Sequence, residues 1–327
     1  MNYRRLGKTD LMISEIGFGA WGIGGGWGTP DDSEARLALS TAFDKGVNFY
    51  DTALGYGDGH SEELIGTVFH HKRNQVIIAS KIPPKTSRWP VKDDERLEDV
   101  FPAKWIVECT ETSLKNLGSD YLDLQQLHAW TDSFTNQPEW REALEKLKKE
   151  GKIRAYGVSA NDWDPYGAIN LVKAGLVDSV QVIYNIFEQR PQEQLLPAAL
   201  AAGVGILARV PFEEGLLVKK ITSETLFDRE DWRAEWLTRE QLAEAERRVT
   251  ALEAFLDLEH PTLVDLALKF ILGNPAVSST IPGMRTVDHV KVNITSSFGP
   301  PLSPSLLKEL GKHAFAHGWQ YPWSKSK

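Results

Sequence analysis

The sequence is poor in cysteine and has no long apolar run. It contains a single cysteine, Cys109, among 327 residues, so no intramolecular disulfide can form. A chain without disulfides suits a reducing compartment, and we expect a cytoplasmic protein in which Cys109 packs within a helix. No stretch resembles the apolar core of a signal peptide or the roughly 20 apolar residues of a membrane span. We therefore expect no membrane association.

The sequence also lacks an excess of positive charge. It carries 37 Lys and Arg residues against 45 Asp and Glu residues, which gives a formal net charge of −8. Such a balance does not favour nucleic acid or an anionic membrane surface as a partner, so any phosphate-binding site has to be local. Hydrophobic residues make up 42% of the chain, enough for a large core. The length fits two average domains or one α/β barrel with additional helices.

Short apolar strands alternate with helical segments along most of the chain. Five of the helical segments end in a glycine before the next strand, at Gly46, Gly118, Gly151, Gly175 and Gly203. Glycine in this place is typical of the position just after a helix, and continuous apolar strands between helices are typical of a parallel sheet covered by helices. About eight such units predict an α/β fold, a single (β/α)₈ TIM barrel that spans residues 1–327 as one domain.

Four segments depart from this alternation. Residues 3–14 contain two short strands around a turn and predict an N-terminal β-hairpin. Residues 83–102 and 211–238 are long connections after the third and seventh strands, and connections of this length usually form lids or binding loops. Residues 301–327 predict an additional C-terminal helix and a tail with aromatic residues.

One glycine-rich stretch imitates a dinucleotide-binding motif. Residues 17–22 match the spacing G-x-G-x-x-G, but that motif has to lead directly into a helix. Here the chain continues with further glycines, and the next helix begins near Asp31 and Asp32. We therefore predict a loop at the mouth of the barrel in place of a Rossmann motif. Trp21 and Trp27 in this loop would be substrate walls or packing aromatics.

Three successive strands are followed by ionisable residues. Asp51, Lys81 and His128 each come directly after a predicted strand. Tyr56 lies in the glycine-rich loop that leads from Asp51 to the next helix, and we expect that helix to have Ser61 as its N-cap. Because active sites of (β/α)₈ barrels lie at the C-terminal ends of the strands, we expect these side chains to converge.

The four side chains suit proton donation to a carbonyl oxygen. A phenol has a pKa of about 10 and is a poor acid at neutral pH. A lysine ammonium within hydrogen-bonding distance lowers that pKa, and a carboxylate beyond the lysine keeps it charged. The pattern predicts Tyr56 as a general acid assisted by Lys81 and Asp51, with His128 orienting the carbonyl.

In these residues the sequence resembles the aldo-keto reductases. The similarity rests on Asp51-Thr-Ala, Tyr56, Lys81 and Leu127-His128, and it covers nearly the whole chain. It implies one (β/α)₈ catalytic domain whose N-terminal hairpin closes the bottom of the barrel and whose long loops shape the substrate pocket. It also implies the NAD(P)H-dependent reduction of aldehydes or ketones to alcohols, in which the nicotinamide supplies hydride and no metal is needed.

The resemblance further implies a nucleotide-binding site. Ser159 and Gln181 would hold the nicotinamide carboxamide, and Asn161 would be either a further carboxamide contact or the cap of a helix at 165–173. Backbone amides at a helix N-terminus and an arginine both suit phosphate, so Arg285 would bind the 2′-phosphate, which favours NADP over NAD. The remaining candidate cofactor contacts are Trp21, Pro211, Gly215, Gly283, His289 and Asn293.

Arg209 departs from the family pattern. At this position the family usually has an aromatic residue, most often tyrosine, stacked on the nicotinamide. A guanidinium plane can also stack on an aromatic ring, but beside an oxidised, positively charged nicotinamide it is electrostatically unfavourable. We therefore expect Arg209 either to favour the reduced cofactor or to pair with Glu213 or Glu214.

Two other functions are compatible with the same residues. One is a nucleotide-binding regulatory or sensing protein with little turnover, like the channel-associated β subunits of the family. The other is a sugar or polyol dehydrogenase that works in the oxidising direction. His313 and His317 have the spacing of a metal-binding helix face, but no third ligand is evident, and we expect no metal. The physiological carbonyl substrate and the oligomeric state, monomer or homo-oligomer, stay open.

Overall fold

The computed structural model describes most of the chain. The described residues are 1–25, 31–162, 164–227, 231–235 and 237–315. Trp27, His317 and the aromatic residues of the C-terminal tail lie outside them, so the predictions made for these residues are not addressed by the structure.

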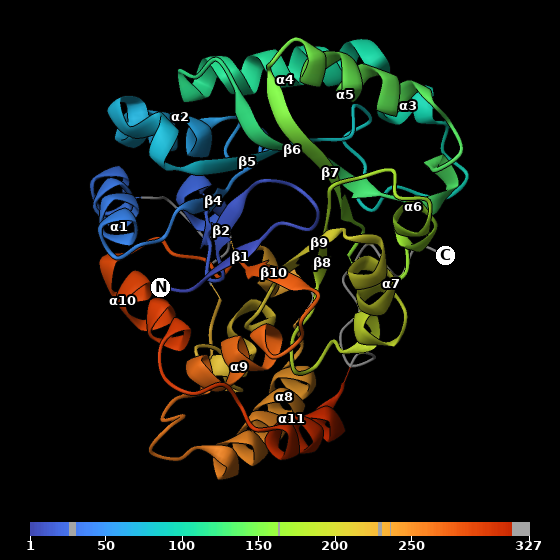
Figure 1. The fold of residues 1–327 in the computed structure, drawn as a ribbon. Coiled ribbons are helices and arrows are strands. Elements are labelled where there is room, and N and C mark those ends of the chain that lie inside the picture. Colours follow the sequence, from blue (N-terminus) through green and yellow to red (C-terminus); the bar gives the residue numbers. More distant parts are fainter. Residues whose placement is uncertain (26–30, 163, 228–230, 236, 316–327) are drawn as a thin grey trace.

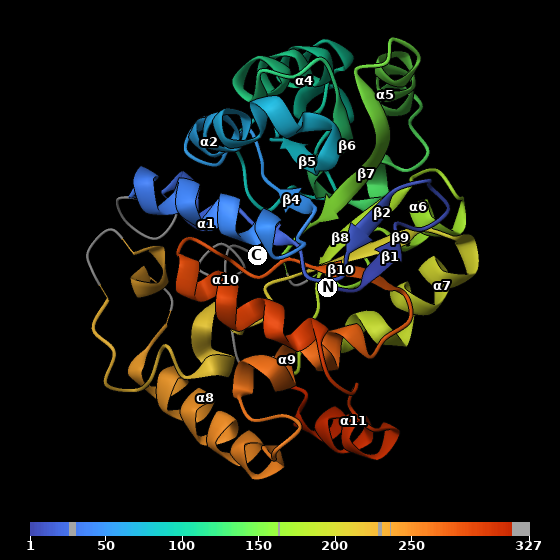
Figure 2. The same cartoon turned by 60° about the vertical axis from the view of Figure 1, so that its left-hand side comes forward.

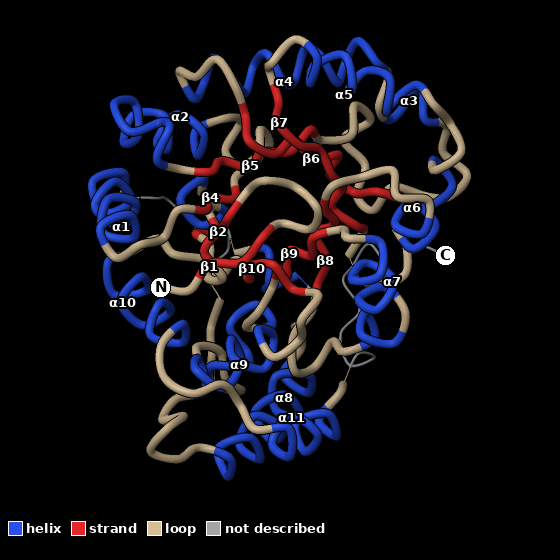
Figure 3. Tube along the Cα trace, viewed as in Figure 1, coloured by secondary structure: helices blue, strands red, loops and turns tan. Residues whose placement is uncertain are grey.

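Eight parallel strands form the centre of the molecule, and helices surround them (Figures 1 and 3). The strands are β3 (Phe18–Gly19), β4 (Phe49–Asp51), β5 (Ile77–Ile82), β6 (Leu122–Trp130), β7 (Ile153–Ala160), β8 (Ser179–Ile183), β9 (Gly205–Arg209) and β10 (Val277–Thr280). They are hydrogen-bonded in chain order. The first and last strands also meet, because Ile16 and Gly19 form parallel bridges with Thr280 and Gly283. The sheet therefore closes into the predicted (β/α)₈ barrel.

The helices between the strands cover the outside of the barrel. They are α1 (Asp32–Asp44), α2 (His60–Phe69), α4 (Ala103–Leu117), α5 (Glu139–Lys149), α6 (Ile169–Lys173), α7 (Leu195–Ala202), α9 (Leu263–Leu272) and α10 (Val287–Ile294). The five glycines predicted to follow helices have φ angles between 57° and 92°, the left-handed conformation that ends a helix. The alternation predicted from the sequence is therefore confirmed.

Three further helices interrupt the alternation of strands and helices. They are α3 (Leu97–Val100), α8 (Arg239–Leu252) and α11 (Pro304–Leu310). In both ribbon views, α8 and α11 lie beyond α9, away from the barrel (Figures 1 and 2). The additional C-terminal helix is thus confirmed. Among the described residues, no helix has both the length and the apolar character to cross a membrane.

Two sequence predictions about local structure also hold. Residues 17–22 lead into a short 3-10 turn (Trp21–Gly24), and α1 begins only at Asp32, with the Asp31 side chain accepting hydrogen bonds from the first turn. Cys109 is buried on α4 within the main core, and burial raises the pKa of its thiol to about 12. A thiol in this state is a packing residue and a poor nucleophile.

The N-terminal hairpin closes the end of the barrel at which the strands begin. Its strands β1 (Tyr3–Arg5) and β2 (Met12–Ser14) pair antiparallel. Its apolar residues Leu6, Leu11 and Ile13 are buried against the barrel interior. The interior residues that they join include Phe49, Ala79, Leu124, Ala155 and Leu207. The opposite end of the barrel is left for the site.

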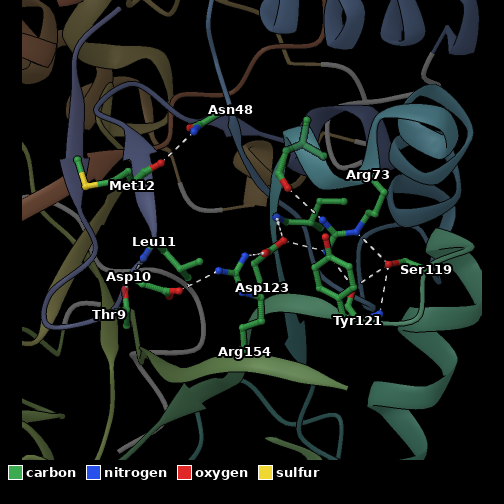
Figure 4. Close-up of polar contacts among 12 residues, drawn as sticks. Thr9, Asp10, Leu11, Met12, Asn48, Arg73, Ser119, Tyr121, Asp123 and Arg154 are labelled. Atoms are coloured by element: carbon green, nitrogen blue, oxygen red, sulfur yellow. Dashed lines mark hydrogen bonds and ion pairs between the residues drawn. The ribbon is translucent and has the colours of Figure 1, made fainter. Parts of the chain in front are cut away.

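Ion pairs fix the hairpin and the strands at this closed end (Figure 4). Asp123 on β6, whose side chain is 1% exposed, accepts hydrogen bonds of 2.8 Å from both Arg73 and Arg154. The same carboxylate accepts the backbone N–H of Ile78 on β5 at 3.0 Å. Arg154 also pairs with Asp10 of the hairpin at 3.2 Å. The network therefore joins β5, β6, β7 and the hairpin far from the strand ends that carry the site.

Candidate active site

Asp51, Lys81 and His128 lie on three neighbouring strands near their C-terminal ends. Asp51 is the last residue of β4. Lys81 and His128 lie within β5 and β6, because both strands extend slightly further than predicted. Tyr56 follows in the loop between β4 and α2. The predicted convergence of these four residues at one end of the barrel is therefore present.

The ammonium of Lys81 is the centre of this group. It is fully buried and donates to Asp51 Oδ2 at 2.6 Å, to the Thr52 carbonyl at 2.8 Å and to Tyr56 Oη at 3.2 Å. An ammonium has three N–H donors, and here all three are used. Because Tyr56 Oη accepts from Lys81, the phenolic proton is left to point at another acceptor.

The protonation states of this pair differ in part from the sequence prediction. Desolvation raises the pKa of Tyr56, and the positive charge of Lys81 offsets only part of this effect. The expectation that Lys81 brings the pKa of Tyr56 below its ordinary value is wrong, because the loss of water around the phenol outweighs the ammonium. Burial by itself lowers the pKa of Lys81, but Asp51 and Tyr56 raise it by more. At neutral pH a neutral phenol therefore faces a charged ammonium.

His128 is held neutral beside this pair. Burial, and then the positive charges of Lys81 and Arg209, lower the pKa of His128 well below its usual value. A neutral imidazole donates a hydrogen bond but is no longer a competing acid near neutral pH. The centre of its ring lies 6.2 Å from that of Tyr56 and 4.6 Å from that of Trp89. His128 thus suits the orientation of a carbonyl oxygen.

The backbone around His128 is irregular in a way that the sequence did not reveal. The pairing of β6 with β7 shifts between His128 and Trp130. Ala129 between them has φ +75°, a left-handed conformation that is uncommon for a residue with a side chain. Bulges of this kind re-aim side chains next to active sites. The direction of the His128 side chain therefore depends on this bulge.

The loop that carries Tyr56 is anchored by the start of α2. This helix begins at His60 with Gly59 in the N-cap position, so the prediction of Ser61 as the N-cap is wrong. The hydroxyl of Ser61 instead accepts from Thr52 at 2.8 Å and donates to the carbonyl of Ala20 at 3.1 Å. It ties the end of β4 to the end of β3 and fixes the two ends of the Tyr56 loop.

Glu62 is a supporting residue that sequence reasoning missed. Its side chain is fully buried. It accepts hydrogen bonds from Ser80 Oγ at 2.5 Å and from Asn116 Nδ2 at 2.9 Å. Ser80 directly precedes Lys81, so Glu62 links α2 to the strand that carries the ammonium. The feature of the sequence that could have indicated this supporting role is the position of Glu62, six residues after Tyr56.

The predicted carboxamide contacts lie on the next strands. Gln181 on β8 donates through Nε2 to Asp51 Oδ1 at 2.8 Å, so it touches the proton-donor group directly. Ser159 on β7 is fully buried, and its hydroxyl has no hydrogen-bond partner among the described residues. Buried polar atoms are normally satisfied in native proteins. An unsatisfied hydroxyl at this place fits a polar group such as a carboxamide.

Asn161 does not cap a helix. Its side chain accepts from the Val91 N–H at 3.1 Å and donates to the Val91 carbonyl at 2.8 Å, and so holds the 83–102 loop. The helix expected at 165–173 begins only at Ile169, and its first turn donates to the carboxylate of Asp132 instead. The capping prediction is therefore wrong, because a carboxylate from another loop already serves these amides.

Arg209 pairs with neither predicted glutamate. Its guanidinium contacts Asp162 Oδ1 at 2.7 Å and donates to the Ala160 carbonyl at 3.0 Å. Glu213 is turned to Asn185 instead, which donates to its carboxyl at 2.5 Å, and burial raises the pKa of Glu213 well above its usual value. The pairing prediction considered only residues close in sequence, whereas Asp162 reaches Arg209 from the loop that follows β7.

Three other predicted contacts surround the mouth of the barrel. The ring of Trp21 meets that of Tyr56 edge-on at 4.9 Å, and its side chain is 38% exposed. Pro211 is buried and is the second residue after the end of β9. Gly215, with φ +100°, follows two non-glycine residues that also have positive φ. Trp21 is therefore the member of this group that lies beside the catalytic candidates.

The turn after β10 and the start of α10 form the predicted phosphate region. Gly283 lies in this turn, and the side chain of Asn293 donates to its carbonyl at 3.4 Å. His289 has a buried Nδ1 without a hydrogen-bond partner among the described residues. Arg285 lies between these groups in the chain, directly before the N-cap residue Thr286. The residues predicted to contact the adenosine end of the cofactor therefore lie in one short segment of the chain.

A carboxylate also reaches this segment, which sequence reasoning missed. Glu34 on α1 accepts the backbone N–H of Val287, the first residue of α10, at 3.0 Å. The two helices lie side by side (Figures 1 and 2). Because 253 residues separate the partners, no local pattern could have revealed the contact. A negative charge therefore already faces a helix start at which a phosphate is expected.

The described residues show no alternative centre for metal chemistry. Within them, no group of three or more His, Cys, Asp or Glu side chains could hold a metal ion. His313 packs edge-on against Phe255, with ring centres 5.4 Å apart.

Comparison with known proteins agrees with this geometry. Residues 15–314 match the Aldo/keto reductase family. An uncharacterized oxidoreductase, YqkF of Bacillus subtilis, is 31% identical over 316 residues, 96% of each chain. A probable voltage-gated potassium channel subunit beta of Arabidopsis thaliana is 30% identical over 95% of each chain. The holo form of an aldo-keto reductase from Bacillus halodurans superposes with a TM-score of 0.77 and 27% identity over the full length of both chains. The protein therefore belongs to the aldo/keto reductase family of oxidoreductases.

Proposed function

We propose that the protein reduces a small aldehyde or ketone to the alcohol, with NADPH as cofactor and Tyr56 as proton donor. The observation that carries this proposal is the buried ammonium of Lys81, which is shared between Asp51 and Tyr56 Oη. The family membership supports an oxidoreductase, and the group of four side chains supports carbonyl chemistry. We also propose that the 327 residues act as one catalytic domain in the cytoplasm.

The cofactor would lie across the C-terminal end of the barrel. Ser159 and Gln181 would hold the carboxamide, and Arg285, His289 and Asn293 would hold the adenosine end with its phosphate. The unsatisfied hydroxyl of Ser159 supports the first part of this proposal. When bound, the reduced nicotinamide supplies a hydride to the carbonyl carbon. The protein has to supply the position of the substrate and a proton.

The side chains of the site would divide this work. The neutral imidazole of His128 would donate a hydrogen bond to the carbonyl oxygen and orient it. Tyr56 would then donate its proton to that oxygen, and the ammonium of Lys81 would stabilise the phenolate that forms. Asp51 would hold Lys81 in place, since its second oxygen is fixed by Gln181.

A sensing role is the second candidate. The similarity to a probable channel β subunit over nearly the whole chain favours it. The same geometry would then bind the nucleotide while turnover stays low. A dehydrogenase that oxidises a sugar or polyol would use the same residues in the reverse direction, so it differs in substrate rather than in site.

The proposed function is tested by two measurements on the wild-type protein. NADPH binding is measured by fluorescence titration, and NADPH consumption is measured with a panel of small aldehydes that includes a reactive aromatic aldehyde. We expect binding and turnover, with kcat of order 1 s⁻¹ or more. Binding without consumption of any carbonyl would support the sensing role. The dehydrogenase would be supported if the protein reduced NADP⁺ with polyols faster than it oxidised NADPH with carbonyl compounds.

A further inference from the structure

Asp162 joins two side chains that come from opposite sides of the site. Its Oδ2 accepts the indole N–H of Trp89 at 2.6 Å, and its Oδ1 pairs with Arg209 Nη2 at 2.7 Å. The side chains of Asp162 and Arg209 are only 11% and 15% exposed, so solvent screens this pair weakly. Trp89 belongs to the 83–102 loop, and Arg209 ends β9. One carboxylate thus connects the loop to the barrel.

Trp89 is the part of that loop that reaches the catalytic candidates. Its ring meets His128 edge-on, with ring centres 4.6 Å apart and planes at 78°. On the other side of the group, Trp21 meets the ring of Tyr56 edge-on at 4.9 Å. The proposed proton donor and the proposed carbonyl ligand therefore lie between two indoles. A carbonyl bound to Tyr56 and His128 would have its substituent beside these rings.

The rest of the loop is attached independently of Trp89. Asn161 holds both polar backbone atoms of Val91, and Asp93 accepts the hydroxyl of Thr131. These contacts fix the chain just after Trp89 but do not fix the direction of its ring. Among the polar contacts of the described residues, the indole N–H of Trp89 bonds to Asp162. The ring also packs on the main core, and the carboxylate holds its N–H edge in one direction.

We infer that Asp162 is a positioning residue that sets the substrate preference of the proposed reductase by holding Trp89 against His128. The substrates that benefit are carbonyl compounds with a flat aromatic or conjugated substituent, because such groups pack on indole rings. A carboxylate is required, since it accepts from Trp89 and from Arg209 at once. An asparagine has one amide oxygen, which would stay with the charged Arg209 because charge-assisted bonds are the stronger ones.

The inference predicts a selective loss with aromatic substrates. In Asp162→Ala and in Trp89→Phe, kcat/KM for an aromatic aldehyde should fall roughly three- to tenfold, the worth of one aromatic contact. This loss should come mainly from a higher KM, with kcat nearly unchanged. For a short aliphatic aldehyde, kcat/KM should change less than twofold. The double variant should be no worse than Asp162→Ala, since both changes remove the same contact. Asp162→Asn should resemble Asp162→Ala.

Asp93→Ala is the matched control, because Asp93 anchors the same loop through the hydroxyl of Thr131, and the described residues show no polar contact between Asp93 and Trp89 or Arg209. It should leave the ratio of aromatic to aliphatic kcat/KM unchanged. Equal losses for both aldehydes in Asp162→Ala, or additive losses in the double variant, would overturn the inference and make Asp162 a purely structural residue.

The inferred substrate preference rests on the proposed function. A second readout, of the position of the Trp89 ring, does not depend on catalysis. Protein labelled with fluorotryptophan is studied by fluorine NMR, and the resonance missing in Trp89→Phe identifies Trp89. This resonance should shift or broaden in Asp162→Ala and Asp162→Asn and stay in place in Asp93→Ala. An unchanged resonance in both Asp162 variants would contradict the link. If no carbonyl is reduced, the proposed function fails, while this spectrum still decides whether Asp162 holds Trp89.

Discussion

Desolvation has opposite consequences for the two titratable side chains that would touch the substrate. It raises the pKa of the Tyr56 phenol and lowers the pKa of the His128 imidazole, because it disfavours the charged form of each. Both groups are therefore neutral over a wide pH range. Tyr56 keeps the proton that it would donate, and His128 keeps an N–H that it could offer to an oxygen. The division of roles between them follows from their shared environment.

The neutral state of Tyr56 predicts the pH dependence of carbonyl reduction. The protonated phenol is the active form, so activity is present below the pKa of Tyr56 and is lost as the pH rises through it. Because that pKa is raised above its ordinary value of about 10, kcat/KM should stay level from roughly pH 7 to 10 and fall only beyond it. Steady-state rates across this range check the prediction. A fall with a midpoint between pH 7 and 9 would assign the proton to another group.

At the scale of elements, carboxylates join parts of the barrel that are far apart in the chain. Asp123 joins β5, β6 and β7 at the closed end of the barrel, and Glu34 joins α1 to α10 at the open end. The first contact serves the fold. The second lies where the proposed cofactor would place its phosphate, so it bears on function.

The network at the closed end predicts a large loss of stability in Asp123→Ala. The change leaves Arg73, which is 14% exposed, without this carboxylate and leaves the Ile78 N–H without its acceptor. Breaking a buried pair in this way costs about 3 kcal/mol of unfolding free energy. Urea unfolding measures it. Asp10→Ala, which removes a carboxylate that is 83% exposed, should cost less than about 1 kcal/mol. Equal effects of the two changes would contradict this account.

From the contact between α1 and α10, we predict that the negative charge of Glu34 weakens NADPH binding. In Glu34→Gln the amide oxygen can still accept the Val287 N–H, but the negative charge beside the proposed phosphate site is removed. The dissociation constant for NADPH should fall roughly three- to tenfold, while that for NADH should hardly change. Fluorescence titration with each cofactor measures both constants.

Two further variants complete that test. Asp32→Asn removes a carboxylate from the same helix that is paired with His60 and Arg36, and it should leave both constants unchanged. Arg285→Ala should weaken NADPH binding far more than NADH binding. If Glu34→Gln changed the affinities for both cofactors equally, the phosphate would not lie at this helix start.

At the scale of the whole molecule, the barrel could be predicted from the sequence because its signals are local and repeated. Each unit carries its own apolar strand and its own glycine after the helix. The strand-end residues Asp51, Lys81 and His128 could be predicted for the same reason, since the end of a strand is visible in the sequence. The (β/α)₈ topology then determines that neighbouring strand ends meet.

The contacts that the sequence did not reveal depend on residues far apart in the chain. Asp162 meets Arg209 across 47 positions, and Glu34 meets Val287 across 253. The hydroxyl of Ser61 looked like a helix cap because the sequence does not show that the carbonyl of Ala20 competes for it. The pKa of Tyr56 was misjudged because the nearby charge was visible in the sequence while the extent of desolvation was not.

The most direct test of the proposed reductase compares Tyr56→Phe with the wild-type protein. Consumption of NADPH with a reactive aromatic aldehyde and the dissociation constant for NADPH are measured for both. The account predicts that kcat falls roughly a hundredfold or more in the variant, because the ring stays and only the donated proton is lost, while NADPH binding stays within about twofold. Turnover that survives in Tyr56→Phe would contradict the assignment of Tyr56 as the proton donor.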